Sequence, residues 1–252
     1  MTKKGGKAFV AGGGMTKFEK PGRREWDYPD NTCSTGSSSL YLARALVAGG
    51  LADCVPAVGF EKMERGSLKM HFPDRLNPMD RHIEAMYELQ CSPTSDGSAA
   101  AIVVSEGFLD EHDGMVDRAV EIVAQAMVTD LESTFADRSA RSIVGSQMTA
   151  KAANEVYELG GVGPEDVQVI ELHECFASNE LISYEGLGLC AEGEAGRLID
   201  DGDVDYGGKW VVIGLGSAAV VSLYRQAPCQ AARRYSGTTA APPRPMTTHL
   251  PP

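Results

Sequence analysis

Two short segments of this sequence combine residue types that could carry out nucleophilic or acid–base chemistry. The first is residues 31–36 (NTCSTG), which place Cys33 directly before a stretch with helical spacing. A cysteine at the start of a helix feels the positive end of the helix dipole and unpaired N–H groups, and both favour the nucleophilic thiolate. The alternative is a small buried hydrophobic residue, which the polar, glycine-containing neighbours make less favoured for Cys33.

The second segment is residues 173–176 (HECF), which follow the predicted strand 167–172 (VQVIEL). Proteins of the α/β class place their sites at the carboxyl ends of strands, so His173 and Cys175 could form a proton donor and acceptor pair. The alternative is a hydrogen-bonded loop histidine beside a packed cysteine. A metal site at His173 and Cys175 is less favoured, because no third and fourth ligands are evident.

Two further patterns do not meet the requirements of the sites they resemble. Residues 214–219 (GLGSAA) match GxGxxA, but too little chain follows to complete a dinucleotide-binding βαβ unit. Residues 200–205 (DDGDVD) resemble part of a calcium loop, but the glycine is misplaced and the closing glutamate is missing. We interpret the acidic segment as a solvated turn.

The composition excludes several classes of protein. The chain has 252 residues, a net charge of −12 and six cysteines, none of which forms a CxxC pair. An acidic surface repels phosphate backbones, so we expect no nucleic-acid partner. We see no signal peptide and no apolar run of membrane-spanning length. These features predict a soluble protein with free thiols in a reducing compartment.

Strands alternate with helices along the chain, which indicates a layered α/β fold. Residues 40, 43, 46 and 47 predict one buried helical face, which ends at Gly49 and Gly50, and residues 152, 153, 156 and 159 predict another. Pro56 is awkward for a central strand, because proline cannot donate to the ladder. The predicted strands are residues 7–11, 53–58, 98–104, 120–125, 167–172 and part of 209–224, and the predicted helices are those after Cys33 and at 84–89, 149–159 and 179–187.

Four segments together resemble the thiolase family. Residues 33–37 (CSTGS) are similar to its nucleophile motif, residues 57–63 (AVGFEKM) to its glycine-glutamate-methionine stretch and residues 95–101 (SDGSAAA) to its D-G-A-A-A strand entry. Residues 173–181 (HECFASNEL) resemble the H-D-C-F motif of the sterol-carrier-protein type. The resemblance covers most of residues 7–225 as separate blocks and implies a thiolase-like layered fold with two βαβαβ-type halves.

The resemblance also implies a mechanism. Cys33 would attack an acyl-CoA thioester and carry the acyl group, and Cys175 would act as the general acid and base. His173 would help to form one oxyanion hole, and the backbone N–H near Gly214 would complete another. The family implies acyl-CoA substrates with branched or sterol side chains, coenzyme A as a substrate with no permanently bound cofactor, and a homodimer. Relatives occur in bacterial cytoplasm and in peroxisomes, and we expect a cytoplasmic location.

The blocks are joined more closely than in the family. Family segments are missing after Asp30, between residues 89 and 90, and after residue 211, where the N-P-S-G-G and G-H-P motifs would follow. The G-H-P histidine activates the nucleophile in the family, and no other histidine of this chain matches it by motif. We therefore expect a shortened domain over residues 1–225, with halves at about 7–104 and 119–225, and a disordered tail over residues 226–252. An inactive acyl-CoA-binding or partner-binding protein and a Cys/His hydrolase remain alternatives to the acyltransferase.

Overall fold

A computed structural model describes residues 6–16, 34–61, 91, 96–136, 139–173, 175–214 and 220–226. The predicted nucleophile Cys33, the predicted helix 84–89 and the tail after residue 226 lie outside these described residues. Strands alternate with helices through most of the described chain, so the α/β class is confirmed. The predicted strands and helices within the described part are all present, and most of their ends differ by one to four residues.

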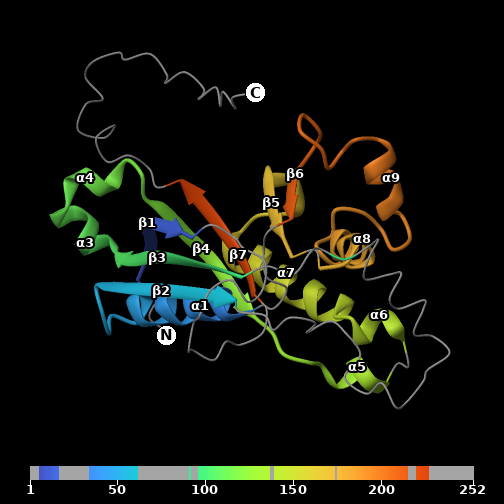
Figure 1. Ribbon diagram of the computed structural model, residues 1–252, viewed down its shortest axis with the longest axis horizontal. Coiled ribbons are helices and arrows are strands. Elements are labelled where there is room, and N and C mark those ends of the chain that lie inside the picture. The colour runs from blue at the N-terminus through green and yellow to red at the C-terminus, as the bar shows by residue number, and fades with distance from the viewer. Residues whose placement is uncertain are drawn as a thin grey trace.

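Five strands form the larger sheet, in the order β2-β3-β1-β4-β7 (Figure 1). Neighbouring strands of this sheet run antiparallel. Strands of the predicted N-terminal half meet those of the C-terminal half through the β1–β4 pair, which contains Phe9 opposite Glu121 and Val10 opposite Val120. The strands are β1 (Ala8–Met15), β2 (Cys54–Glu61), β3 (Gly97–Ser105), β4 (Val120–Met127) and β7 (Val220–Gln226).

A separate sheet contains the parallel strands β5 (Val169–Leu172) and β6 (Val211–Gly214). Although β6 ends at residue 214 and β7 begins at residue 220, these two strands belong to different sheets. The predicted strand region 209–224 therefore contributes to both sheets. In Figure 1 the smaller sheet lies with α8 and α9, away from β1, β2 and β3.

Helix α1 (Thr35–Ala48) covers one face of the larger sheet. Its residues Ala43 and Val47 are buried against Ala57 of β2 and Val103 of β3. The helix ends at Gly49, and the following Gly50 has a φ of 70°, as the two glycines predict. Leu46 was predicted to be buried, and this was wrong: its side chain is 40% exposed, because the buried stripe of α1 is narrower than the helical spacing suggests.

Arg44 connects α1 to an irregularity in β4. The pairing of β4 with β7 shifts between Ile122 and Ala124, which is the pattern of a β-bulge. The guanidinium of Arg44 donates hydrogen bonds to the carbonyl oxygens of Ile122 (3.4 Å) and Val123 (3.3 Å). A charged donor on the helix thus binds carbonyl groups at the bulge and fixes α1 across the sheet.

Strand β2 lies at an edge of the described sheet, and Pro56 fits this position. The Ser105 N–H donates to the carbonyl of Asp53. The backbone N–H and C=O groups of the odd-numbered residues of β2 therefore point toward β3, and those of the even-numbered residues point away from it. Pro56 therefore occupies a position at which β3 needs no N–H donor. The next outward donor, the N–H of Val58, binds the Ser39 hydroxyl of α1 at 3.0 Å.

The start of α1 touches β2 through two glycines. A Cβ atom added to Gly59 would lie 2.3 Å from the Cα atom and 2.7 Å from the nitrogen of Gly36. Both distances are shorter than real Cβ contacts, so the two backbones meet without space for a side chain. Gly36 and Gly59 come from two different sequence motifs, and their contact fixes the start of α1 on β2.

Two short helices cover the opposite face of the sheet, and the sequence analysis did not anticipate them. They are α3 (Glu106–Glu111) and α4 (Asp113–Val116). The Ser105 hydroxyl caps α3 by accepting the Phe108 N–H at 3.2 Å. His112, which matches no catalytic motif, stacks on Phe108 with ring centroids 4.1 Å apart, and its Nδ1 lies 2.8 Å from the Phe108 carbonyl oxygen.

Helix α7 (Ser146–Gly160) is buried on two sides. Ala152 and Val156 pack on β4, whereas Ala153 belongs to the hydrophobic cluster formed with α8 (Ala177–Gly186), α9 (Ala195–Asp200) and the segment before β6. Leu159 was predicted to share one buried face with these residues, and this was wrong, because its side chain is 71% exposed. Figure 1 shows α7 between the larger sheet and the region that contains α8.

Trp210 is central to the cluster around α8. Its side chain is 2% exposed, and its Nε1 donates a hydrogen bond to the carbonyl of Pro164 at 2.9 Å. The Tyr157 hydroxyl of α7 donates to the carbonyl of Leu187 at 2.9 Å, directly after α8. The buried Trp210 and the partly buried Tyr157 thus have partners for their polar atoms, and they bind α7, α8 and β6 into one packed unit.

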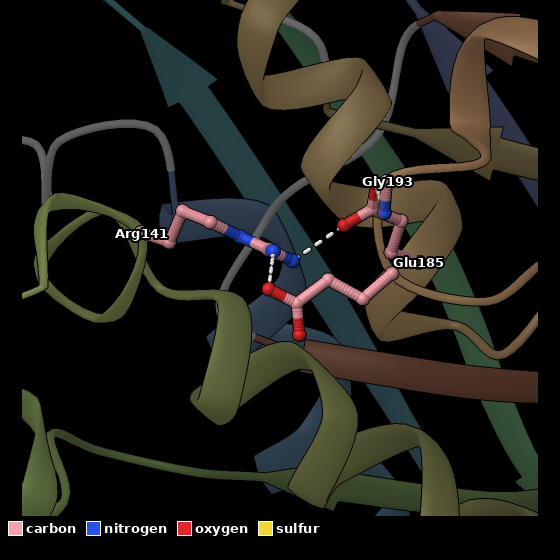
Figure 2. Close-up of polar contacts among 4 residues, drawn as sticks. Arg141, Glu185 and Gly193 are labelled. Carbon is pink, nitrogen blue, oxygen red and sulfur yellow. Dashed lines mark hydrogen bonds and ion pairs between the residues drawn. The ribbon is translucent and has the colours of Figure 1, made fainter.

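A second connection to α8 is ionic. The guanidinium of Arg141, in the short helix α6 (Ala140–Ile143), forms ion pairs with the carboxylates of Glu185 in α8 and Glu192 beyond it (Figure 2). Glu185 also accepts the backbone N–H of Gly193 at 2.9 Å. The Glu185 side chain is 12% exposed and the Glu192 side chain is 78% exposed, so the pair with Glu185 is the better shielded from water. Helix α5 (Glu132–Ala136) precedes α6.

The contact between the two glycines leads to a first prediction. We expect Gly59→Ala to lower the free energy of unfolding by about 1–3 kcal/mol, because the added methyl group would force the start of α1 away from β2. The control is Gly14→Ala, since a Cβ at Gly14 meets no atom within 4 Å, and we expect a change within about 0.5 kcal/mol. Urea unfolding followed by circular dichroism measures both. Equal stability of the two variants would contradict the proposed contact.

The two carboxylates bound by Arg141 give a matched pair of variants. We expect Glu185→Gln to lower the free energy of unfolding by about 1–2 kcal/mol, because it weakens a shielded ion pair and a hydrogen bond to backbone. Glu192→Gln removes an exposed ion pair and should change the free energy of unfolding by less than about 0.5 kcal/mol. Thermal unfolding monitored by tryptophan fluorescence would compare them. A larger effect of Glu192→Gln would show that the shielded pair does not hold α8.

Candidate functional site

Three of the four predicted site residues lie at the carboxyl end of the smaller sheet or within three residues after it in the chain. Leu172, the last residue of β5, pairs with Gly214, the last residue of β6. His173 follows β5 directly, and Cys175 lies two residues further on. The end of the parallel strand pair therefore holds His173 next in the chain to the residue that pairs with Gly214, and Cys175 follows two residues after His173. Cys33 directly precedes Ser34, the N-cap residue of α1, and lies outside the described residues.

The segment after β5 is folded back onto the start of α8. Phe176 is the N-cap residue of α8, and the side-chain amide of Asn179, in the first turn, donates a hydrogen bond to the carbonyl of His173 at 2.9 Å. His173 itself is half-buried. The sequence analysis did not single out Asn179, although an asparagine within the first turn of a helix often bonds to nearby backbone. Asn179 positions the backbone between the strand and the helix.

Opposing effects act on the Cys175 thiol. Its half-buried position raises its pKa, because burial disfavours the charged thiolate. The backbone N–H groups of Cys175 and Phe176 contact the sulfur and lower the pKa by a smaller amount. Cys175 consequently keeps its proton at neutral pH. When the proton is released, the two backbone N–H donors would stabilise the thiolate. A thiol in these surroundings can give a proton and take one back.

Cys91 lies next to this segment, and the sequence analysis did not single it out. It forms an isolated antiparallel β-bridge with Phe176, the residue after Cys175. Burial raises the pKa of the Cys91 thiol, and the neighbouring Cys175 raises it further. None of the described cysteines, which are Cys54, Cys91, Cys175 and Cys190, forms a disulfide. No sequence motif connects Cys91 to Cys175, because the two residues are far apart in the chain and meet through the bridge.

The described part of the chain contains neither a metal-binding cluster nor a membrane-spanning helix. Among these residues, His, Cys, Asp and Glu side chains form no group of three or more that could hold a metal ion. None of the described helices is long and apolar enough to cross a membrane.

Comparisons with known proteins agree on one family. Residues 131–220 match the family model "Thiolase C-terminal domain-like". Sterol carrier protein 2 of Rattus norvegicus is 36% identical over 333 residues, which cover 82% of this chain and 61% of the relative. Non-specific lipid-transfer protein-like 2 of Caenorhabditis elegans is 30% identical over 335 residues, covering 82% of this chain and 81% of the relative.

Solved structures give the same fold. The structure titled Ltp2-ChsH2(DUF35) aldolase superimposes with a TM-score of 0.61 at 17% sequence identity, covering 83% of this chain and 84% of the other. At this identity the likeness concerns the fold alone, and it agrees with the thiolase-like layered architecture expected from the sequence.

The alignments also confirm that internal segments are missing. The chain spans 61% of the length of the rat sterol carrier protein 2. The aligned 82%, about 207 of the 252 residues, is spread over 333 positions, which leaves about 126 positions of the relative without a residue of this chain. Only five residues lie between the end of β6 and the start of β7, in the part of the chain where the family motifs after residue 211 would be expected. The family model, the alignments and the fold together show that this chain belongs to the thiolase family, among the relatives of sterol carrier protein 2.

Proposed function

We propose that this protein is an acyl-CoA C-acyltransferase of the 3-ketoacyl-CoA thiolase type that acts in lipid or sterol side-chain metabolism. The observation that carries the proposal is the placement of His173, Cys175 and Gly214 at one end of the β5–β6 pair in a chain of this family. Relatives named for sterol carriage and lipid transfer support a lipid acyl-CoA as substrate. Coenzyme A enters this reaction as a substrate.

The proposed reaction runs through an acyl-cysteine. The Cys33 sulfur attacks the thioester or ketone carbonyl of the substrate, and the bond from that carbonyl to the leaving group breaks. Cys175 gives a proton to the departing carbanion or thiolate and later takes one from the incoming nucleophile. The raised pKa of Cys175 supports this role, because a thiol that is protonated at neutral pH can act first as an acid.

Two oxyanion holes would stabilise the negative oxygen atoms that develop in this reaction. His173 contributes to the first, and the hydrogen bond from Asn179 to its carbonyl supports a fixed backbone at this position. The backbone N–H near Gly214 contributes to the second. The parallel register of Leu172 with Gly214 supports this assignment, because it brings the two donor groups to the same end of the sheet.

A second candidate function rests on the missing segments. The chain contains no G-H-P motif, and a base that activates the nucleophile is worth orders of magnitude in rate. A thiolase-like protein that binds acyl-CoA or a partner subunit without turnover would need neither the histidine nor an activated Cys33.

A Cys/His hydrolase would need Cys33 and His173 within hydrogen-bond reach, and it would release free acid instead of passing the acyl group to coenzyme A. Assembly as a homodimer and a cytoplasmic location, with the peroxisome as alternative, stay predictions.

Intact mass separates the acyltransferase from the inactive binding protein. We expect incubation with acetyl-CoA to add one acetyl group, about 42 Da, because an activated thiolate forms a stable enough acyl-cysteine to be weighed. Cys33→Ala should abolish the gain, whereas Cys54→Ala, which replaces an exposed cysteine, should leave it unchanged. Addition of coenzyme A should then remove the acetyl group. A folded protein that gains no mass would contradict the acyltransferase.

The direction of the pKa shift at Cys175 predicts a pH dependence. Alkylation by iodoacetamide follows the thiolate fraction, so the rate at Cys175 should reach half its maximum at a pH above that of a small free thiol such as N-acetylcysteine. Peptide mapping by mass spectrometry after timed alkylation at several pH values gives this profile. A midpoint below that of the free thiol would contradict the role of Cys175 as an initial acid.

A further inference from the structure

We propose that Glu61 takes the proton of the Cys33 thiol and thereby serves in place of the histidine of the absent G-H-P motif. Glu61 belongs to residues 57–63, which resemble a family motif, and the reaction described above gives its carboxylate no role. The placement of Glu61 depends only on the fold. Its use in catalysis rests on the proposed function, in which Cys33 carries the acyl group.

The Glu61 side chain points to the face of the larger sheet that α1 covers. Strand β2 pairs with β3 without a register shift from Cys54 to Glu61, so side chains two residues apart lie on the same face. Ala57 packs against α1, and a Cβ atom at Gly59 would touch Gly36 in the first turn of α1. Glu61 is the next residue of this series, and its side chain therefore extends toward α1 as well.

Two contacts show the direction in which α1 crosses β2. The N–H of Val58 binds the Ser39 hydroxyl at 3.0 Å, and the next residue of the strand, Gly59, meets Gly36. Each further residue of β2 thus corresponds to a position nearer the start of α1. The end of β2 and the start of α1 therefore lie at the same place.

The lengths of the two elements place Glu61 level with Cys33. From Gly59 to Glu61 the strand rises about 6.6 Å, which is the rise of about four residues of helix. Counted back from Gly36, this length reaches the residues directly before Ser34, the N-cap residue of α1. Cys33 precedes Ser34 in the chain, so its Cα atom lies about 3.8 Å from that of Ser34.

Burial and the helix dipole suit the Glu61 carboxylate for exchange of a proton. Its Oε1 atom is shielded from water, and a shielded carboxylate holds a proton more readily than one in solution. The first turn of α1 contains no acidic residue, so no charge of its own offsets the positive end of the dipole. This end stabilises one negative charge, either on Glu61 or on the Cys33 sulfur, which lowers the cost of moving a proton between them.

Asp96 is a second carboxylate at this end of the β2–β3 ladder. Glu61 pairs with Gly97, and Asp96 directly precedes Gly97. By strand alternation, the Asp96 side chain belongs to the face opposite that of Glu61. Asp96 is therefore not placed to take the same proton.

The proposed step returns the pair to its starting state. The S–H bond of Cys33 breaks, the proton passes to the Glu61 carboxylate, and the sulfur bonds to the carbonyl carbon of the thioester. The bond from that carbon to the sulfur of coenzyme A then breaks, and the departing thiolate takes its proton from Cys175. When the acyl group later leaves Cys33, the sulfur recovers the proton from Glu61.

Alkylation of Cys33 by iodoacetamide at several pH values tests the proton transfer without any acyl group. Cys33 is the only cysteine of the tryptic peptide 25–44, so mass spectrometry after timed alkylation follows it alone. Exchange within the pair keeps a small constant fraction of thiolate, so we expect a rate that is independent of pH below neutrality and rises when the second proton leaves. Glu61→Gln should replace the flat region by a fall of about tenfold per pH unit. It should also lower the midpoint of the rise, because it removes a neighbouring negative charge.

Two further variants control the measurement. Glu106→Gln removes an exposed carboxylate that pairs with Lys7, and its profile should match that of the parent protein. Glu61→Asp keeps a carboxylate on a shorter side chain and should retain a flat region at a lower rate. Circular dichroism checks the fold of each variant, and the flat region of the parent protein keeps the test decisive if Glu61→Gln does not fold.

Two results would overturn the proposal. Identical profiles of Glu61→Gln and the parent protein would show that Glu61 is not beside the thiol. A lowered midpoint in Glu61→Gln without a flat region in the parent protein would show a nearby charge that exchanges no proton.

Failure of the proposed function looks different. The flat region would then be present and depend on Glu61, while acetyl-CoA would still leave Cys33 unmodified. If both proposals hold, Glu61→Gln should slow acetylation of Cys33 below neutrality by the same factor as alkylation, and the difference from the parent protein should disappear at alkaline pH.

Discussion

The burial of α7 on two sides is the constraint on which the rest of the structure depends. One side of the helix rests on β4 through Ala152 and Val156, and the other holds the cluster that contains Tyr184 and Trp210. Small side chains in the first turns of α7 allow the larger sheet and α8 to approach the helix. One example is the close contact of Gly186 in α8 with Thr149 in α7. The two sheets share no strand pairing in the described chain, so side-chain packing through α7 takes the place of a continuous ladder. The position of β5, and therefore of His173 and Cys175, follows from this helix.

Much of this arrangement could be predicted from the sequence, because the strands and the longer helices have clear hydrophobic patterns. The end of β5 was recognisable as a candidate site from residues 173–176, which combine a histidine and a cysteine after an apolar run. The buried faces of the helices were less predictable. Leu46 and Leu159 fit the helical period and yet point into solvent, because the width of a buried stripe depends on what packs against it.

The remaining features depend on contacts between distant segments, which one sequence does not reveal. The position of Arg44 follows from the bulge in β4, and the pairing of Cys91 with Phe176 brings Cys91 next to the residue that follows Cys175. The short helices α3, α4, α5, α6 and α9 have too few residues to show a period, and tertiary packing stabilises them. Likewise β1 continues past its apolar residues through Gly12, Gly13 and Gly14, since its backbone pairs with β3 without any contribution from side chains.

The edge formed by β2 has a consequence for the fate of a shortened chain. Loss of neighbouring segments usually turns an outer strand into a template for amyloid-like growth, in which each molecule adds a strand to the last. On β2 the proline at position 56 offers no donor, and the Val58 donor is already occupied by Ser39, so an incoming strand would find two successive outward positions without a free N–H donor. Strand addition at this edge is thereby disfavoured, because Pro56 and Ser39 leave it fewer backbone donors than an ordinary outer strand presents.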